Sequence, residues 1–369
     1  MYDVVIVGAG PSGSTVARLI GNKYKVLLIE KRELIEPMKK DLSSTKSCGG
    51  LLSPVTQKIF GRLGFSLPKD VLVEPQLFAV RVIDSARKIE RYYERTYINL
   101  DRSKFDEWLA SMIPLNVEVK FGCKFESYER KDDHLLIKFS DKRNTYIDKT
   151  KVLVGADGAS SLIRRQVTPK RYLPKTYFAA QEWVKCKNPI LPFFSVIFDP
   201  EITDYYSWVI PKGEFLIIGA ALNPNDKAPG KFLLLKEKLE DFGYRFGDPV
   251  KREGAFIFRP LKTKQLSTGE KGVALVGEAG GWISPCSGEG LSYAFGTAVV
   301  LSEVLQESLE NFEVRYKRRL RKLKRSILSK NIKSHFIFNP FLRKILMKTG
   351  IKSIKLYLNP QESSPEIFT

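Results

Sequence analysis

The stretch YDVVIVGAGPSGSTVARLI, residues 2–20, decides the fold of this chain. Its first six residues form an apolar run that predicts a short buried strand. Three glycines follow at the spacing GxGxxG, and an amphipathic pattern then predicts a helix that begins near Pro11 or Ser12. A second apolar strand, KVLLIE, occupies residues 25–30. The order strand, glycine turn, helix, strand predicts a βαβ unit and therefore an α/β fold.

The glycine turn contains the residues that a dinucleotide site requires. Gly8 permits the tight turn, Gly10 lets the backbone approach a pyrophosphate, and Gly13 allows the helix to pack closely. The helix N-terminus, with Ser12 in its first turn, faces the anion. Glu30 lies 22 positions after Gly8, where a carboxylate can accept hydrogen bonds from ribose hydroxyls. We therefore expect dinucleotide binding, and a purely structural glycine turn is the alternative.

Two later segments repeat the order strand, glycine, acid and small-residue loop. They are VLVGADGASSLIRR, residues 152–165, and VALVGEAGGWISP, residues 273–285, with Asp157, Gly158 and Glu278 at their key positions. FAD and NAD(P) share the GxGxxG fingerprint. Two further glycine segments far along the chain suit a long flavin dinucleotide that distant parts of the chain enclose. The sequence therefore favours FAD as the cofactor.

The composition indicates a globular protein of one large or two closely joined domains. The chain has 369 residues, of which 43% are hydrophobic, and no apolar run approaches the ~18 residues that span a bilayer. An apolar strand begins at Tyr2, which leaves no room for a signal peptide. Four cysteines without CxxC spacing indicate neither a disulfide framework nor a zinc site, and no metal is expected. We expect a cytoplasmic protein.

The two glycine–acid segments resemble the DG and GD motifs of FAD enzymes with the p-hydroxybenzoate hydroxylase type of fold. LDRSKFDEWL, residues 100–109, is similar to the RxxFDxxL helix of that superfamily. The resemblance implies a Rossmann-like FAD-binding domain in which Arg102, Asp157, Gly158 and Glu278 lie close to the cofactor. Glu278 stands where the wider superfamily usually has Asp. A second GxGxxG for an NAD(P) domain is absent, as the resemblance leads one to expect.

Three further segments carry a more specific likeness. They are KSCGGLLSP (46–54), YYSWVIPKG (205–213) and GEAGGWISPCSGEGLSYA (277–294). Together they resemble the geranylgeranyl reductase family of flavoproteins, most closely its CbrA-type bacterial members. The resemblance implies FAD-dependent reduction of carbon–carbon double bonds in a polyprenyl (geranylgeranyl-type) lipid or related isoprenoid. It implies NAD(P)H or ferredoxin as the electron donor.

The same resemblance assigns roles to individual residues. It places the Cys-Gly-Gly segment and the SPxxGEG loop against the flavin, and the YxWxxPKG segment along the substrate cavity. The catalytic candidates are Cys48, Tyr206 and Trp208; the substrate-binding candidates are Tyr206, Trp208, Pro211 and Gly213; and the further cofactor-binding candidates are Cys48, Gly49, Gly288, Gly290 and Leu291. We expect Cys48 to shape the alkene pocket or to supply a proton.

Several alternatives stay open at this point. Tyr206 and Trp208 have the pattern of core aromatics on a strand, and Lys212 has that of a turn residue more than of a proton donor. A redox pair between Cys48 and Cys286 is a weaker alternative to a single catalytic thiol. A flavin-dependent monooxygenase on the same scaffold is the first alternative function. A non-catalytic flavin-binding protein associated with a membrane is the second.

The domain prediction follows from the order of these segments. We expect a discontinuous FAD-binding domain, an inserted and largely antiparallel α+β substrate domain, and a basic helical C-terminal segment. The predicted ranges are 1–75, 100–170 and 262–312 for the first, 76–99 and 171–261 for the second, and 313–369 for the third.

The charge of the chain is concentrated in this last segment. The formal net charge is +20, yet Val314 to Gln361 contain 15 Lys or Arg and no Asp or Glu. The remainder has 46 basic and 41 acidic residues and is close to balanced. Interleaved apolar and cationic residues are typical of basic amphipathic helices. The segment therefore predicts peripheral contact with an anionic membrane at its inner face; a solvated helical cap is the main alternative, and nucleic acid is disfavoured.

Overall fold

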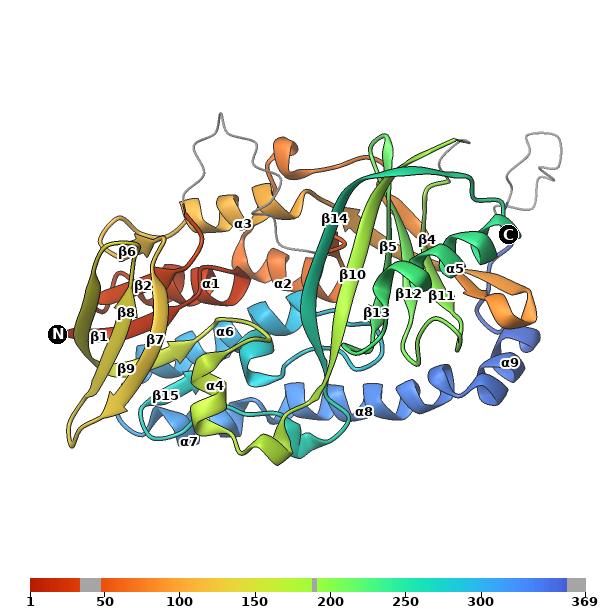
Figure 1. Cartoon of the computed structure of the whole chain (residues 1–369). Coiled ribbons are helices and arrows are strands. Elements are labelled where there is room, and N and C mark those ends of the chain that lie inside the picture. The colour runs from red at the N-terminus through yellow and green to blue at the C-terminus, as the bar shows by residue number, and fades with distance from the viewer. Residues whose placement is uncertain (34–47, 188–190, 357–369) are drawn as a thin grey trace.

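Two β-sheets dominate the structure and lie at opposite ends of the molecule (Figure 1). The computed structural model describes residues 1–33, 48–187 and 191–356. The first sheet has seven strands in the order β6-β2-β1-β9-β8-β7, with β15 paired to β9. The second has eight strands in the order β14-β10-β13-β12-β11-β4-β5-β3.

The first sheet contains the predicted βαβ unit. Strand β1 (Tyr2–Val7) leads into helix α1 (Pro11–Ile20), and strand β2 (Val26–Glu30) then pairs parallel to β1. Val4 and Ile6 of β1 pack into a core shared with α1 and α6, while Val5 and Val7 pack into a second core on the other face. Because both faces of β1 are covered, every side chain in its apolar run except that of Asp3 is buried.

The remaining elements of this unit come from three distant parts of the chain. They are α2 (Pro54–Leu63), α3 (Arg102–Ser111), β6 (Glu118–Phe121), β7 (Lys124–Arg130), β8 (Leu135–Ser140), β9 (Thr145–Gly155), α4 (Leu162–Val167), β15 (Val273–Leu275) and α6 (Leu291–Glu307). Asp101 accepts hydrogen bonds from the N–H groups of Ser103 and Lys104 and thereby caps α3, a position at which Asp is strongly favoured.

The second sheet is largely antiparallel, as predicted, and within the described residues β4–β11 is its one parallel pair. Its strands are β3 (Leu51–Leu52), β4 (Leu77–Asp84), β5 (Ile89–Asn99), β10 (Lys175–Cys186), β11 (Phe193–Phe198), β12 (Ser207–Lys212), β13 (Phe215–Leu222) and β14 (Phe246–Arg259). Helix α5 (Ala228–Glu240) packs on one face, and an aromatic core that includes Tyr206 and Trp208 covers the other.

Strand membership supports the predicted division of the chain. All strands of the first sheet fall within 1–75, 100–170 and 262–312, and the second sheet is built from 76–99 and 171–261 apart from the two-residue β3. Because β3 pairs with β5, it carries the Cys-Gly-Gly segment from the first unit to the edge of the second sheet. We propose these ranges as the domain boundaries.

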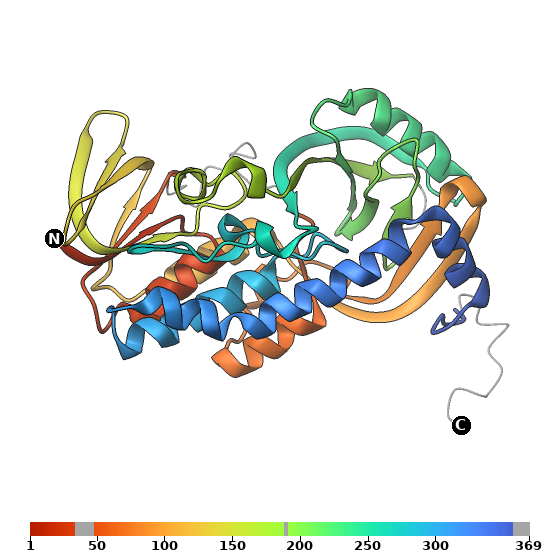
Figure 2. The same cartoon turned by 90° about the horizontal axis from the view of Figure 1, so that it is seen from below.

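The predicted helical C-terminal segment is present and joins both units. Helices α7 (Phe312–Arg319), α8 (Arg321–Phe338) and α9 (Pro340–Thr349) follow one another along the lower side of the molecule (Figure 2). Near its start α8 buries Ile327 in the core of the first unit, and at its end Phe338 packs on Tyr205 of the second, with ring centroids 5.1 Å apart. Residues 357–369 of the predicted segment lie outside the described residues.

The side chain of one buried arginine contacts both α8 and the segments on which α8 packs. Arg259, at the end of β14, lies against the rings of both Tyr205 and Phe338, at 4.4 and 4.2 Å from their centroids. Its guanidinium also donates to the Pro285 carbonyl (3.2 Å) and to the Ser334 hydroxyl of α8 (3.1 Å).

Within the described residues no helix is long and apolar enough to cross a membrane.

Candidate active site

The turn after β1 can be formed only by glycine at two of its positions. Gly8 has φ +104°, and a Cβ atom there would lie 2.6 Å from the carbonyl oxygen of Ala156. A Cβ atom on Gly13 would overlap the carbonyl oxygen of Gly8. The turn is therefore closed tightly onto α1 and onto the segment that contains Asp157, which unites two of the predicted motifs.

Open space lies beside the middle glycine of the turn. Among the described residues, no atom apart from the two chain neighbours lies within 4 Å of the position that a Cβ on Gly10 would take, and no side chain caps the N-terminus of α1. Helix N-termini attract anions through their N–H groups and their dipole. The backbone here therefore has the form that a pyrophosphate group requires.

Asp157 supplies a second indication that a ligand belongs here. Its Oδ2 accepts a hydrogen bond from the Leu162 N–H (3.0 Å), whereas its Oδ1 is buried without a partner among the residues that the structure describes. Burial raises the pKa of this carboxyl to about 6, although the hydrogen bond from Leu162 opposes the shift. Gly158, directly after it, has φ +75° and open space at its Cα. A ligand hydroxyl that donates to Oδ1 would satisfy the buried oxygen.

The third glycine segment reaches the same turn. A Cβ on Gly277 would collide with the hydroxyl of Ser12, so this segment contacts the first turn of α1 directly. The Gly277 N–H donates to Thr297 of α6 (2.8 Å). Glu278 Oε1 accepts from the Phe258 N–H (2.9 Å), which ties the segment to the end of β14. All three predicted motifs thus converge at the N-terminus of α1.

Glu30 lies at the end of β2, as predicted, but protein groups already contact its carboxylate. It accepts hydrogen bonds from the Ala9 N–H (2.7 Å) and from the N–H and Nε of Arg32 (3.0 and 3.2 Å). Although burial opposes its ionisation, the Arg32 charge and these hydrogen bonds hold the pKa of Glu30 below its ordinary value. Glu30 is therefore ionised at neutral pH and is an acceptor beside the glycine turn.

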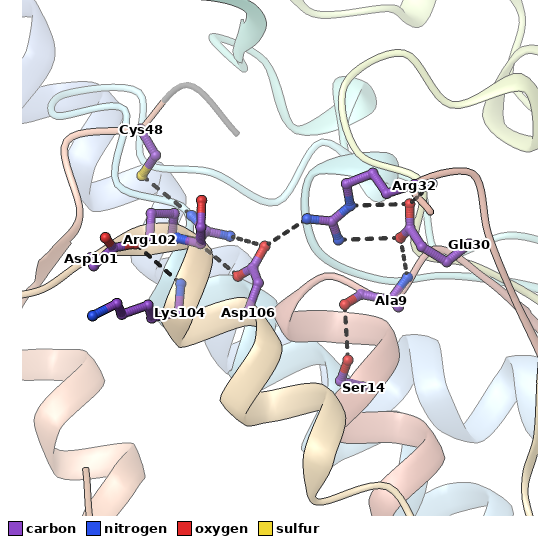
Figure 3. A network of polar contacts seen from close by, with 10 residues as sticks. Ala9, Ser14, Glu30, Arg32, Cys48, Asp101, Arg102, Lys104 and Asp106 are labelled. Atoms are coloured by element: carbon purple, nitrogen blue, oxygen red, sulfur yellow. Dashed lines mark hydrogen bonds and ion pairs between the residues drawn. The ribbon is translucent and has the colours of Figure 1, made fainter. Parts of the chain in front are cut away.

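A chain of charged groups runs from this turn to Cys48 (Figure 3). Arg32 joins Glu30 to Asp106, with 3.4 Å between Nη1 and Oδ2. Asp106 pairs with Arg102 at 2.8 Å on α3, and Arg102 Nη1 donates to the Cys48 sulfur at 3.2 Å. Burial opposes the charge of Arg102, but Asp106 and Cys48 hold its pKa above the ordinary value. A fixed positive charge therefore lies against the thiol and favours its ionised form.

The two glycines after Cys48 let this turn pass close to β12. A Cβ on Gly49 would lie 2.5 Å from Cδ1 of Ile210, and one on Gly50 would lie 2.7 Å from Nζ of Lys212. Gly50 has φ +59°, and its N–H points to the Cys48 sulfur at 3.5 Å. Glycine is thus required at positions 49 and 50, because the turn packs closely against β12 of the second unit.

Lys212 is buried in the site, and its interpretation as a turn residue is wrong. It is the last residue of β12, and its ammonium donates to the carbonyls of Leu100 (2.7 Å) and Gly50 (3.1 Å) and to Oδ1 of Asn99. Burial lowers its pKa to about 7, although Cys48 and Asp101 oppose this shift. Lys212 therefore holds the Cys-Gly-Gly turn in place and gains or loses a proton near neutral pH.

The pH dependence of stability tests this burial. Between about pH 7 and the ordinary lysine pKa of 10.5, the unfolded chain holds a proton at Lys212 that the folded chain has released, so stability gains from rising pH. A Lys212→Met variant lacks this gain. From pH 7 to pH 9 we expect the stability of the parent relative to the variant to rise by roughly 1–2 kcal/mol in urea titrations. If the stability of the parent and that of the variant changed equally with pH, the prediction would be contradicted. Lys170→Met, on the surface, is the control.

The aromatic pair of YYSWVIPKG connects β12 to the SPCSGEG loop. The Tyr206 hydroxyl donates to the Ser287 carbonyl (2.6 Å), and the Tyr206 and Trp208 rings lie 5.6 Å apart. Burial raises the pKa of Tyr206 above its ordinary value, so this phenol is a poor acid. Trp208 packs over Gly219, and its indole N–H has no acceptor among the described residues. Both side chains belong to the aromatic core, as the alternative interpretation holds, and Tyr206 also holds the loop.

The other predicted residues lie around this pair. Pro211 lies in β12, and its carbonyl accepts from Asn99 (2.8 Å); Gly213 forms the hairpin turn after β12 with φ +61°. Gly290 caps α6, and Leu291 is its first, buried residue. The Gly288 N–H donates to the Ser284 carbonyl (3.0 Å). Gly290 and Leu291 are therefore the positions where binding of an anion by backbone N–H groups remains expected.

Relatives of this chain were found among known proteins. It is 39% identical over 355 residues to the protein CbrA of Escherichia coli O9:H4 (strain HS), with 96% of this chain and 94% of that protein covered. It is also 39% identical to CbrA of Shigella sonnei (strain Ss046), with 96% and 98% covered. The chain belongs to the CbrA family. No protein-family model matches it.

Solved structures share the fold of this CbrA family member. A geranylgeranyl bacteriochlorophyll reductase-like protein from Thermoplasma acidophilum has a TM-score of 0.79 at 19% identity, with 98% of this chain and 94% of that chain covered. PqsL of Pseudomonas aeruginosa, a probable FAD-dependent monooxygenase, has 0.66 at 17% identity over 95% and 99%. A variant of halogenase PltM in complex with FAD has 0.68 at 15% identity over 89% and 75%. These likenesses confirm the predicted fold class.

The two predicted cysteines of this CbrA family member contact different helices. Cys48 lies against Arg102 of α3, whereas the Cys286 thiol donates to the Lys330 carbonyl of α8 (2.7 Å). All four cysteines are free thiols. Cys48 and Cys286 therefore form no disulfide in this structure, and the redox pair stays a prediction.

Three residues of the site in this CbrA family member were not predicted. Arg32 follows Glu30 by two positions, and Asp106 is the acid of the RxxFDxxL helix, four residues after Arg102. An acid four positions after an arginine on a helix is a readable pairing signal. The third, Asn99, gives no sequence signal for its contact with Lys212.

Proposed function

We propose that this chain is an FAD-dependent oxidoreductase that reduces carbon–carbon double bonds of a polyprenyl lipid or related isoprenoid. The observation that carries the proposal is the convergence of three glycine segments on the N-terminus of α1, linked by charged side chains to the half-buried thiol of Cys48. The likeness of fold to a geranylgeranyl bacteriochlorophyll reductase-like protein supports the reductase branch.

The described residues fit FAD. The backbone around Gly10 and the N-terminus of α1 would hold its pyrophosphate, and Glu30 would accept hydrogen bonds from a ribose. The unpaired Oδ1 of Asp157 would accept from a further hydroxyl. Bound and reduced FAD supplies the hydride that one alkene carbon takes up.

The protein must deliver a proton to the other alkene carbon and exclude water. The Cys48 thiol is the proton donor in this proposal, and Arg102 at 3.2 Å stabilises the thiolate that remains. Lys212, which holds the Gly50 carbonyl, keeps the turn in position. The rings of Tyr206 and Trp208 form an apolar wall, because an isoprenoid alkene offers no polar group for orientation.

A reaction without oxygen tests the function. The flavoprotein, reduced by dithionite, is mixed anaerobically with a geranylgeranyl lipid while its flavin absorbance is followed. We expect reoxidation and a product heavier by two hydrogens in mass spectrometry. A product that gains oxygen in air, with NAD(P)H consumed, would instead show the monooxygenase that the likeness to PqsL suggests. A bound flavin that no polyprenyl substrate reoxidises would show the non-catalytic alternative. Replacing dithionite by NADH, NADPH or reduced ferredoxin identifies the donor.

Asp157 gives the proposal a test that does not depend on turnover. Because its pKa lies near 6, its carboxylate becomes protonated and a weaker acceptor as the pH falls from 7 to 5. We expect FAD affinity to fall over this range, and Asp157→Ala to lose affinity roughly tenfold at pH 7. Asp157→Asn should show a flat pH profile in fluorescence titrations with FAD. Affinity unchanged by both substitutions would contradict the contact, and Asp133→Ala on the surface is the control.

A further inference from the structure

Helix α8 exposes an apolar stripe on the side that faces away from the protein. Leu328, Ile332 and Phe336 follow at intervals of four residues, which places them along one side of the helix. All three are exposed, Ile332 by 65%. On the opposite side Ile327 and Ser334 are buried against the rest of the molecule. The stripe is thus additional to the face by which α8 packs.

Helix α9 continues this pattern. Phe341, Ile345 and Leu346 are exposed, Phe341 by 67%. On its inner side Met347 is buried, and Arg343 pairs with the buried Asp84 at 2.8 Å. The helix is therefore anchored to the second unit, and its apolar residues remain in solvent although both helices are well packed.

Positive charge surrounds these apolar residues. The exposed cations on the two helices and just after them are Arg321, Lys322, Lys324, Arg325, Lys333, Lys344, Lys348, Lys352 and Lys355. No Asp or Glu occurs from Val314 to the last described residue. Lys322 and Lys333 flank the apolar stripe on one side and Lys324 on the other, as the helical repeat requires. The surface therefore combines exposed Leu, Ile and Phe with Lys and Arg that form no ion pair with another described residue.

We propose that this surface of α8 and α9 docks onto an anionic lipid bilayer. The apolar side chains enter the boundary between headgroups and acyl chains, while the cations meet the lipid phosphates. A second copy of the chain would bring an equally positive surface against the first, which like charges oppose. Nucleic acid would pair with the cations but leave Ile332 and Phe341 in water. The bilayer is the occupant that satisfies both parts of the surface, and this proposal is independent of the catalytic one.

Co-sedimentation of the full chain with liposomes tests the docking surface. We expect binding to vesicles of phosphatidylcholine with phosphatidylglycerol, weakening with added salt, and little binding to phosphatidylcholine alone. The triple variant Leu328→Ser, Ile332→Ser, Phe336→Ser should bind roughly tenfold less. The triple variant Lys322→Gln, Lys324→Gln, Lys333→Gln should bind less and lose much of its salt dependence. Thermal unfolding verifies that each variant is folded.

A matched control removes exposed apolar residues elsewhere. Leu115→Ser, Ile147→Ser and Leu233→Ser change side chains that are exposed away from α8 and α9, and this variant should bind as the parent does. Equal loss in the control, no binding by the parent, or equal binding to neutral vesicles would overturn the proposal. So would a dimer in sedimentation velocity that the Leu328, Ile332 and Phe336 changes dissociate, or nucleic-acid binding that they leave intact while vesicle binding is absent.

Discussion

A Gly10→Ala variant is expected to fold as the parent does and to purify without FAD. Gly10 has φ −74° and ψ −175°, an extended conformation that alanine adopts without strain, and in the described part of the chain no atom beyond its neighbours would meet the added methyl group within 4 Å. The methyl would instead occupy the space in front of α1 where the proposed pyrophosphate lies. We expect FAD affinity to fall roughly 100-fold, measured as flavin absorbance per purified chain and by FAD titration.

Two glycine variants provide the comparison. In Gly13→Ala the added methyl overlaps the Gly8 carbonyl, so the turn itself must move and the unfolding temperature should drop. Gly61→Ala lies inside α2 with free space around it, so it should keep FAD and unfold at an equal or slightly higher temperature. Full retention of FAD by Gly10→Ala would show that the turn is only structural.

Replacement of Cys48 by alanine is expected to leave FAD bound and to abolish most alkene reduction. The thiol is the proposed proton donor, and its loss also leaves the buried Arg102 without one of its two side-chain contacts. A positioned acid typically contributes 10²–10⁴-fold to rate, so we expect at least roughly a 100-fold lower turnover. Single-turnover reoxidation of the reduced flavoprotein by a polyprenyl lipid measures this step directly.

Other cysteine variants separate the roles of this thiol. Cys48→Ser keeps the size of the side chain but not its acidity, and should recover little turnover. Cys286→Ala should remain active, because its sulfur contacts α8 and not the Cys-Gly-Gly turn. Unchanged turnover in Cys48→Ala would assign the residue to the shape of the pocket alone. Loss of turnover in both Cys48→Ala and Cys286→Ala would restore the redox pair.

Local features of the site could be predicted from the sequence. The turn at Gly8 and Gly13 is encoded within a few residues, because the tight path and the close helix leave no room for a side chain. The cap of α3 by Asp101 is equally local. The resemblance between motifs implies that Arg102 lies close to the cofactor. Its contact with Cys48, which lies 54 residues earlier in the chain, comes from the structure alone.

Contacts between distant segments could not be predicted. Lys212 meets Gly50, Asn99 and Leu100 only after two domains have folded against each other, and a lysine before a glycine on a hairpin usually faces solvent. Tyr206 and Trp208 fit both a core strand and a binding wall, since both roles demand buried aromatic side chains. The spacing of apolar residues in a sequence indicates which side chains are buried, but not which residues they pack against.

The guanidinium of Arg259 limits how the site can open. Because one buried group joins the end of β14, the loop at Pro285 and helix α8, moving any of these three alone would break hydrogen bonds of a buried charge. Movement of these three elements together keeps those hydrogen bonds intact. A long substrate of the proposed reaction is therefore expected to enter without separating the end of β14, the loop at Pro285 and α8.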